Sequence, residues 1–596
     1  MKKFILITFI LMLGENYISY GQIKVRNENS SINSKIPQEK LFVHLNTTLL
    51  LTGDHFYYKV YCLNSEANKL SHFSKIVYVE LIDSDKNQIF KQKVRLESGL
   101  GQGDFFIPTS VQSGNYKLIA YTQWMRNKEE NKFFQNDVSI INPFSDNQNN
   151  ILKKSNQIDT IQITKFKEQN QQLGKLNEII ELDTNELVGL ELNTNKFQNR
   201  EKVVLNIKGK KGLESFGNYS ISVRKMQQIK IPNKLTSTAF LTLFSHEKKS
   251  SSLVNKDSIY LPELRGELLS GNVIFKDSRN RVPNAKVALS ISGRDYIFKI
   301  ANTNSFGVFY FNLDNEYKSL KATVEVINND SENFEVEIHQ QKTLDYGTLV
   351  FNDFWITENE KNVILEHSIF NQIENAYTSL RSDVVNQSKP ITPFYSSNTN
   401  EYILDDYVRF PTMNETIVEV LNLVYTRQRK GIRTAHVVRP NNTYDSGQLP
   451  LILIDGQRIR DHNKFIDFNP NKVKKISVVR EKYIYGSQLF DGIISLETIE
   501  GDYKNIDSNA LIKNVELSRP LDKKNYFKQV YDGSGKLKRI PDYRIQLLWL
   551  PNLEISSKTN EINFFTSDVN GTFEISLEGF TNNGDPVSLK EIIVVE

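Results

Sequence analysis

Short runs of alternating apolar and polar residues, separated by turn-forming residues, dominate this sequence. The segments 56–61, 76–82 and 114–121 are typical, because each is rich in aromatic and β-branched residues and lies next to Asp, Asn or Gly. Alternation with a period of two predicts strands that bury one face, and strands spaced about 8–12 residues apart are typical of β-sandwiches. The sequence therefore predicts a mainly β fold built of serial β-sandwich modules.

Residues 1–21 predict a cleavable signal peptide. Two lysines precede an apolar run over 4–13, which has the length of a signal core and is shorter than the ~20 residues of a membrane-spanning helix. Ser19 and Gly21 would supply the small residues before the cut, and no cysteine follows the run as a lipid-attachment site. We therefore expect an exported protein without a membrane span of its own, located in the periplasm or associated with the outer membrane of a Gram-negative bacterium. The alternatives are a buried N-terminal strand and an uncleaved anchor.

Composition argues against several functional classes. Cys62 is the single cysteine among 596 residues, which leaves no internal disulfide and no multi-cysteine metal site. The net charge of +4 is small for this length and both signs are interspersed, so no nucleic-acid partner is expected. The 35 Phe and 26 Tyr can instead build the cores of half-buried sheets.

Changes in the pattern divide the chain into segments. Asn, Gln and Lys dominate one nearly non-periodic stretch, and a helical period appears over 361–383. The predicted segments are a β-sandwich at 38–143, a linker at 144–179, a second β-sandwich-like module at 180–262, a third β-sandwich at 263–345, a helical connector at 346–400, one α+β domain at 401–502, and a C-terminal β module at 510–596.

The α+β segment combines a helix with several short strands. Thr412 and Glu415 fit a capping box, and the apolar stripe over 417–424 predicts a helix that ends near Gly431. Strands are predicted at 451–454, 473–480 and 493–498.

Two sandwich segments resemble known families. Residues 42–46 and 51–54, followed by an aromatic strand, resemble the opening of an alpha-macroglobulin β-sandwich, and 193–197 repeat the pattern weakly. The third segment, with 282–287 and the turn at 303–309, resembles the carboxypeptidase regulatory-like fold. That resemblance implies a non-catalytic sandwich of seven strands, often found ahead of outer-membrane receptors.

The strongest resemblance lies in the α+β segment. Residues 451–456, 468–470, 473–479, 484–486 and 492–496 resemble, in this order, the plug domain of TonB-dependent outer-membrane receptors. The resemblance implies a compact domain used for docking. Its motif residues are Asp455, Gly456, Asn469, Pro470, Tyr485, Gly486 and Gly492.

The sequence departs from both larger families. Fewer than 100 residues follow residue 502, whereas a receptor barrel needs several hundred. Cys62 lacks the neighbouring Glu-Gln pair of a macroglobulin thioester. Neither receptor transport nor covalent trapping is therefore expected.

A search for active-site patterns finds none that is complete. No two of the eight histidines are three to five residues apart, so no helical zinc pair is predicted. The glycine-rich 99–103 lacks the Lys of a phosphate loop, and 83–87 lacks the downstream Gly and Glu of a calcium loop. We expect no enzyme, no catalytic residue, no cofactor and no metal.

Three hypotheses for function remain. The first is a non-enzymatic envelope scaffold that docks to an outer-membrane barrel or another envelope protein through the plug-like segment. The second is a thioester-free macroglobulin-like protease trap, with 144–175 as the candidate bait. The third is an accessory protein for TonB-linked nutrient import, in which Tyr483 and Tyr485 would form a platform for a sugar or peptide.

Overall fold

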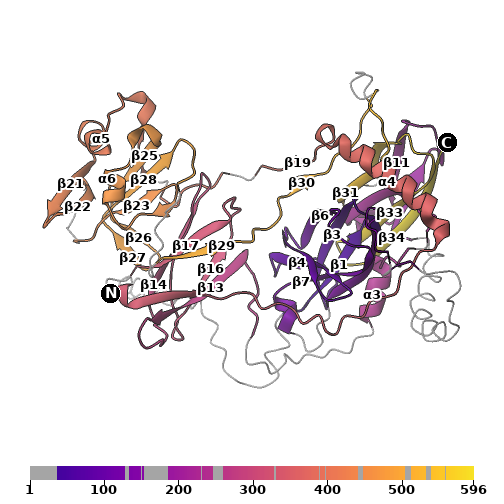
Figure 1. The fold of residues 1–596 in the computed structure, drawn as a ribbon, viewed down its shortest axis with the longest axis horizontal. Helices are drawn as coiled ribbons and strands as arrows, with labels where there is room; N and C mark the ends of the chain where they lie inside the picture. Colours follow the sequence, from indigo (N-terminus) through magenta and orange to yellow (C-terminus); the bar gives the residue numbers. More distant parts are fainter. Residues whose placement is uncertain are drawn as a thin grey trace, which may run out of the picture.

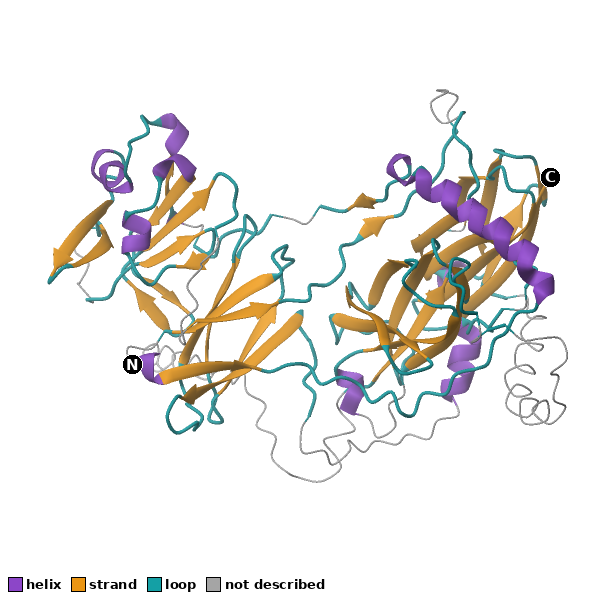
Figure 2. Cartoon of the chain, in the orientation of Figure 1, coloured by secondary structure: helices purple, strands orange, loops and turns teal. Residues whose placement is uncertain are grey.

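The computed structural model describes residues 37–127, 133–148, 151–152, 185–229, 231–245, 259–327, 331–387, 390–395, 398–440, 447–503, 512–531, 539–557 and 559–596. The predicted signal peptide and most of the predicted linker lie outside these residues. Strands dominate the described chain, which confirms the mainly β prediction. Figures 1 and 2 show two lobes linked by several chain segments. No helix in the described ranges is long and apolar enough to cross a membrane.

The first sandwich lies in the lobe drawn on the right of Figure 1. It packs a three-stranded sheet on a five-stranded sheet around large aromatic side chains, including the fully buried Phe42, Tyr58 and Tyr121. In spatial order, its strands are β1 (Glu39–Leu45), β3 (His55–Asn64) and β6 (Leu100–Phe106) in one sheet, and β2 (Leu49–Leu51), β8 (Phe134–Ile141), β7 (Gly114–Tyr121), β4 (Ile76–Asp83) and β5 (Gln88–Arg95) in the other.

The second sandwich is assembled from two distant parts of the chain. The sequence predicts separate modules at 180–262 and 510–596, whereas the structure pairs their strands around one core that includes Val203, Ile221 and Phe573. Neither part alone has enough strands to cover both faces of that core. The strands are β9 (Val188–Leu192), β11 (Lys202–Gly209) and β32 (Thr559–Phe565) in one sheet, and β10 (Lys196–Phe197), β34 (Pro586–Val595), β33 (Gly571–Thr581), β12 (Gly217–Lys225) and β31 (Gln546–Ile555) in the other.

The two sandwiches have the same topology. Taken in chain order, the eight strands of each occupy equivalent places in a three-stranded and a five-stranded sheet. In both, the second strand pairs in parallel with the last strand, as β2 does with β8 and β10 with β34. The short β4–β5 turn of the first sandwich corresponds to the β12–β31 connection of the second. Residues 226–545 are therefore an insertion in one hairpin of a repeated sandwich.

The third sandwich lies within this insertion, in the other lobe. Six strands come from the predicted segment 263–345, and the seventh, β29, comes from beyond the α+β domain and pairs with β17. The strands are β16 (Val308–Leu313), β13 (Glu267–Phe275) and β18 (Phe334–Ile338) in one sheet, and β15 (Ile297–Asn302), β14 (Lys286–Ile291), β17 (Lys321–Val326) and β29 (Ile512–Glu516) in the other.

The α+β domain, residues 400–503, carries a mixed five-stranded sheet and two small helices. The predicted capping box is present, because Glu415 N donates to Thr412 Oγ1 and Thr412 N donates to Glu415 Oε2. The elements are the sheet β20 (Asn400–Ile403), β25 (Val473–Val479), β28 (Ile493–Thr498), β23 (Leu451–Ile454) and β24 (Gln457–Arg458), the hairpins β21 (Val424–Arg429) with β22 (Ile432–Val437) and β26 (Tyr483–Tyr485) with β27 (Gln488–Phe490), and the helices α5 (Met413–Glu419) and α6 (Asn463–Ile466).

One helix prediction in this domain is wrong in its extent. The helix ends at Glu419, and Val424–Arg429 form a strand instead. Lys430 (φ 49°) and Gly431 (φ 79°) both have positive φ, so they form the hairpin turn and not a helix cap. The β-branched and aromatic residues that begin this strand favour the extended conformation.

The helical connector lies along the right-hand lobe and then crosses between the lobes (Figure 1). The helix predicted over 361–383 is α4 (Lys361–Ala376), followed by a 3₁₀ turn at Thr378–Leu380. Between the lobes, β19 (Val384–Val385) pairs with β30 (Lys524–Asn525) (Figure 1). The remaining short elements are α3 (Ser237–Ser245) and the 3₁₀ helices Trp124–Asn127, Gly212–Ser215, Ser331–Asn333, Glu358–Glu360, Leu404–Asp406 and Pro470–Lys472.

Candidate functional site

Asp455, the first motif residue, joins two neighbouring strands. It follows β23 with a φ of 46°, and its buried carboxylate accepts hydrogen bonds from Thr498 N at 2.8 Å and Thr498 Oγ1 at 2.6 Å. Tyr503 N donates to the same carboxylate at 3.0 Å. Asp455 therefore fixes the end of β28 beside β23, which is a structural role.

Two motif glycines permit the third sandwich to approach closely. Gly456 has a φ of 77°, and a Cβ there would lie 2.2 Å from the Cβ of Tyr296. Gly486 has a φ of 58°, and its Cβ would lie 2.9 Å from the carbonyl oxygen of Ile300. Both neighbours belong to the β15 hairpin region of the third sandwich, so a side chain at either glycine would push the two domains apart.

Tyr485 completes this domain contact. Its hydroxyl donates to the Phe298 carbonyl at 2.7 Å, and its ring stacks on Phe394 with centroids 4.1 Å apart. Burial raises the pKa of Tyr485 to about 12. Tyr483 donates to the Phe394 carbonyl. The two tyrosines thus face partners within this chain, which leaves the ligand platform of the third hypothesis without support.

A mixed apolar and polar interface surrounds these residues. The Arg458 guanidinium lies 2.9 Å from the Glu325 carboxylate, and Thr323 donates to Gln457 at 3.0 Å. The apolar part comes from both domains and comprises Ala288, Phe298, Tyr395, Leu451, Leu453, Val479, Phe490 and Ile493.

Asn469 and Pro470 lie apart from this interface, and Gly492 borders its apolar part. The Asn469 side chain accepts from Asn471 N at 2.9 Å and begins the 3₁₀ turn whose first residue is the buried Pro470. Gly492 opens β28 with a φ of 97°, where a Cβ would lie 2.7 Å from the Val479 carbonyl oxygen. The structure therefore brings together Gly456, Tyr485 and Gly486, but not Asn469 or Pro470.

A groove of about 930 Å³ lies beside Asn469, at the end of the α+β domain away from the third sandwich. The start of α5, the β21–β22 hairpin and the segment 466–471 form its walls. Ile432 is 66% exposed at the hairpin tip, and the hairpin has no acidic residue. Its basic residues are Arg427, Arg429, Lys430 and Arg433, of which Arg433 pairs with Asp467 at 2.5 Å.

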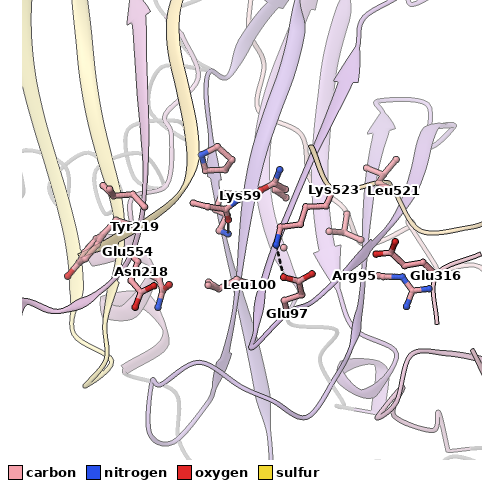
Figure 3. A pocket seen from close by; sticks show the side chains of 16 residues that line it. Lys59, Arg95, Glu97, Leu100, Asn218, Tyr219, Glu316, Leu521, Lys523 and Glu554 are labelled. Atoms are coloured by element: carbon pink, nitrogen blue, oxygen red, sulfur yellow. Dashed lines mark hydrogen bonds and ion pairs between the residues drawn. The ribbon is translucent and has the colours of Figure 1, made fainter. Parts of the chain in front are cut away.

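A second cavity of about 280 Å³ lies between the first and second sandwiches (Figure 3). Lys59 of β3 lines it, and its Nζ donates to Asn552 Oδ1 at 2.7 Å. Burial, followed by the charge of Lys523, lowers the pKa of Lys59 to about 7. Sequence reasoning missed this residue, although Lys59 is the only charged residue in the aromatic run 56–61.

A buried charge cluster lies where α4 meets both sandwiches of its lobe. The Asp54 carboxylate lies 3.1 Å from His367 Nε2 and 3.3 Å from Arg224 Nη2. Burial alone would raise the pKa of Asp54, but the charges of His367 and Arg224 outweigh it and hold that pKa well below its usual range. No sequence motif indicates this cluster, because its members are far apart in the chain.

His44 lies between the first two sandwiches. Its ring nitrogens lie 2.7 Å from Ser220 Oγ and 3.2 Å from Ser576 Oγ. All three residues are buried, and burial lowers the pKa of His44 well below its ordinary value. Within the described ranges, no three His, Cys, Asp or Glu side chains gather as a metal site would require.

Neither a protein-family model nor a curated protein matches the sequence. Among solved structures, the chain is similar to Escherichia coli alpha-2-macroglobulin activated by porcine elastase, with 9% identity, a TM-score of 0.23, and coverage of 94% of this chain and 44% of that chain. Salmonella alpha-2-macroglobulin reacted with methylamine gives 8% identity, a TM-score of 0.23, and coverage of 94% and 39%. A Listeria innocua beta-glucosidase in complex with isofagomine gives 15% identity, a TM-score of 0.13, and coverage of 21% and 20%.

The chain spans less than half the length of these macroglobulins. At such TM-scores the likenesses carry no argument about fold or function. The described residues by themselves define the class: a mainly β protein of several sandwiches with one α+β domain.

Proposed function

We propose that this chain is a non-enzymatic scaffold of the bacterial cell envelope, and that its α+β domain binds an acidic segment of an outer-membrane or other envelope protein. The observation that carries the proposal is the basic β21–β22 hairpin, which borders an open groove at the outer end of that domain. The predicted signal peptide supports the compartment.

The contact at the motif face supports docking through the other end of the domain. Gly456, Tyr485 and Gly486 contact the third sandwich, so the motif face that the resemblance suggested for docking is occupied within this chain. The hairpin, in contrast, presents Arg429 and Lys430 at exposed positions, and no ion pair involves either among the described residues. Charge complementarity then favours an acidic partner segment, with Ile432 adding apolar area.

The test is affinity capture from detergent-solubilised outer membranes with the full chain as bait. The variant Arg429→Glu with Lys430→Glu reverses the hairpin charge. The matched control is Arg265→Glu with Lys321→Glu, at two exposed positions of the third sandwich. We expect wild type and control to capture the same protein, and the hairpin variant to lose it by at least about tenfold, because close charge pairs contribute ~1.5 kcal/mol or more. Recovery of partner-free protein, or equal capture by all three chains, would refute the proposal.

The protease-trap alternative depends on its bait segment, most of which lies outside the described residues. Limited proteolysis distinguishes it from a scaffold: one cut within 144–175 that compacts the molecule favours trapping. The import-accessory alternative loses its proposed platform, because Tyr483 and Tyr485 bind Phe394 and Phe298 of this chain.

A further inference from the structure

Lys59 has a buried side-chain amine that borders a cavity, as expected of a reactive lysine. It lies on β3 with 2% exposure, and its Nζ faces the cavity between the first and second sandwiches (Figure 3). In the described ranges no carboxylate lies within ion-pairing distance of this Nζ. The nearby Glu97 pairs instead with Lys523 at 2.6 Å.

The hydrogen-bond partners of Lys59 orient its side-chain amine but include no negatively charged group. Asn552 Oδ1 accepts one N–H of Lys59, and the Asn552 amide in turn donates to Gln102 Oε1. A neutral amide acceptor orients the amine but adds no negative charge to favour the ammonium form. With its pKa near 7, about half of the Lys59 amine is unprotonated at neutral pH, against less than about 0.1% of an ordinary lysine of pKa ~10.4.

We propose that Lys59 is a covalent binding site for small aldehydes that enter this cavity. The Nζ lone pair attacks the carbonyl carbon, a C–N bond forms, and the carbonyl oxygen takes up a proton to become a hydroxyl. Loss of that hydroxyl as water, with the proton released from nitrogen, leaves an imine. No electron is gained or lost, so the step needs no oxidant or reductant.

The cavity limits the class of ligand. Its volume of about 280 Å³ is at the low end for small-molecule pockets, which favours a ligand of only a few carbons. Besides the reacting Lys59, its wall carries two basic and three acidic side chains, so that little net charge remains, which favours an uncharged aldehyde. These lining residues are Arg95, Lys523, Glu97, Glu316 and Glu554.

The test uses the full chain, butyraldehyde as probe and cyanoborohydride to trap the imine, with modification of each lysine measured by peptide mass spectrometry. At pH 7 we expect Lys59 to react at least about tenfold faster than the exposed Lys361, and to lose its advantage below pH 6. The matched variant Asn552→Asp keeps the side-chain shape and places a carboxylate beside the amine. It should suppress reaction at Lys59 at least tenfold while Lys361 is unchanged.

Circular dichroism of both chains checks that the variant is folded. If Lys59 reacts no faster than Lys361 in the folded wild type, the site is closed and the proposal is wrong. Equal reaction of Lys59 in wild type and the Asn552→Asp variant would also overturn it, because the amide environment would then have no influence on the amine.

Discussion

Replacing Gly456 by alanine should open the contact between the α+β domain and the third sandwich. The substitution adds a methyl group that would lie 2.2 Å from the Tyr296 Cβ, far inside the ~3.5–4.0 Å at which carbon atoms attract each other. Two terms then destabilise the chain: the positive φ, which disfavours any Cβ in the turn, and the collision with Tyr296, which acts only in the docked state.

The chain offers a control that separates these two terms. Gly431 has a φ of 79°, against 77° at Gly456, but a Cβ at Gly431 would meet nothing within 4 Å. In both alanine variants the positive φ should lower the free energy of unfolding by about 1–2 kcal/mol. Only Gly456→Ala should destabilise the docked state by a further ~1–3 kcal/mol, because its methyl group overpacks the contact with Tyr296. That difference corresponds to roughly 5- to 150-fold in the docking equilibrium.

Hydrogen exchange followed by mass spectrometry measures this equilibrium directly. Peptides that cover β15 should exchange faster in Gly456→Ala than in Gly431→Ala, because opening exposes Phe298 and its neighbours. Peptides of the first sandwich should be equally protected in both variants. If the two variants give the same β15 protection, the close approach at Tyr296 does not hold the domains together and the reasoning is refuted.

Three further predictions concern stability. Leu517 follows β29 and is 7% exposed in the core of the third sandwich. The substitution Leu517→Ala should destabilise that sandwich by about 2–5 kcal/mol. Unchanged hydrogen-exchange protection of β13 and β14 would contradict this expectation. Because the folded-state pKa of Asp54 is lowered, its contribution is complete above its unfolded pKa of ~3.9 and is lost as pH falls toward the folded value. Asp54→Asn should therefore lower the melting temperature at pH 7 by an amount that shrinks toward pH 3, and a constant difference across this range would count against the assignment. Glu263 accepts a hydrogen bond from Tyr78 at 3.0 Å, and burial raises its pKa to about 7. The contribution of Glu263 to the free energy of unfolding is therefore greatest below pH ~4.5 and falls by about 3 kcal/mol as pH rises to 7. The substitution Glu263→Gln should flatten this part of the pH–stability curve. An unaltered curve would show that Glu263 is not the group responsible.

Local features of the sequence predicted local features of the structure. The strands at 451–454, 473–480 and 493–498 and the capping box at Thr412 are all present, to within a residue. Each depends on neighbouring residues only: on alternation or on a side chain three positions away. Such local patterns can be recognised in the sequence because they do not depend on which other segments of the chain pack against them.

Long-range pairing could not be predicted in the same way. The runs around Tyr219 and Leu577 both read as strands, but nothing in either indicates that they belong to one sheet, more than 300 residues apart. The same holds for β29, whose partner strand lies on the other side of the α+β domain in the chain. Gly456 is an example of what the sequence alone cannot predict. The sequence identifies it as a motif glycine, whereas its contact with Tyr296 exists only in the folded chain.

The place of the insertion explains why α4 matters to the whole molecule. Arg224 and Gln546 are paired across β12 and β31, so the insertion leaves and re-enters the second sandwich at one point. Such a hairpin loop can grow at little entropic cost, because loop-closure entropy rises slowly with length. Helix α4 fastens both ends of it: His367 lies against the Asp54–Arg224 pair, and Glu374 accepts from Tyr543 N at 2.6 Å. Because Asp54 belongs to the first sandwich and Arg224 to the second, α4 ties the ends of the insertion to both sandwiches of this lobe.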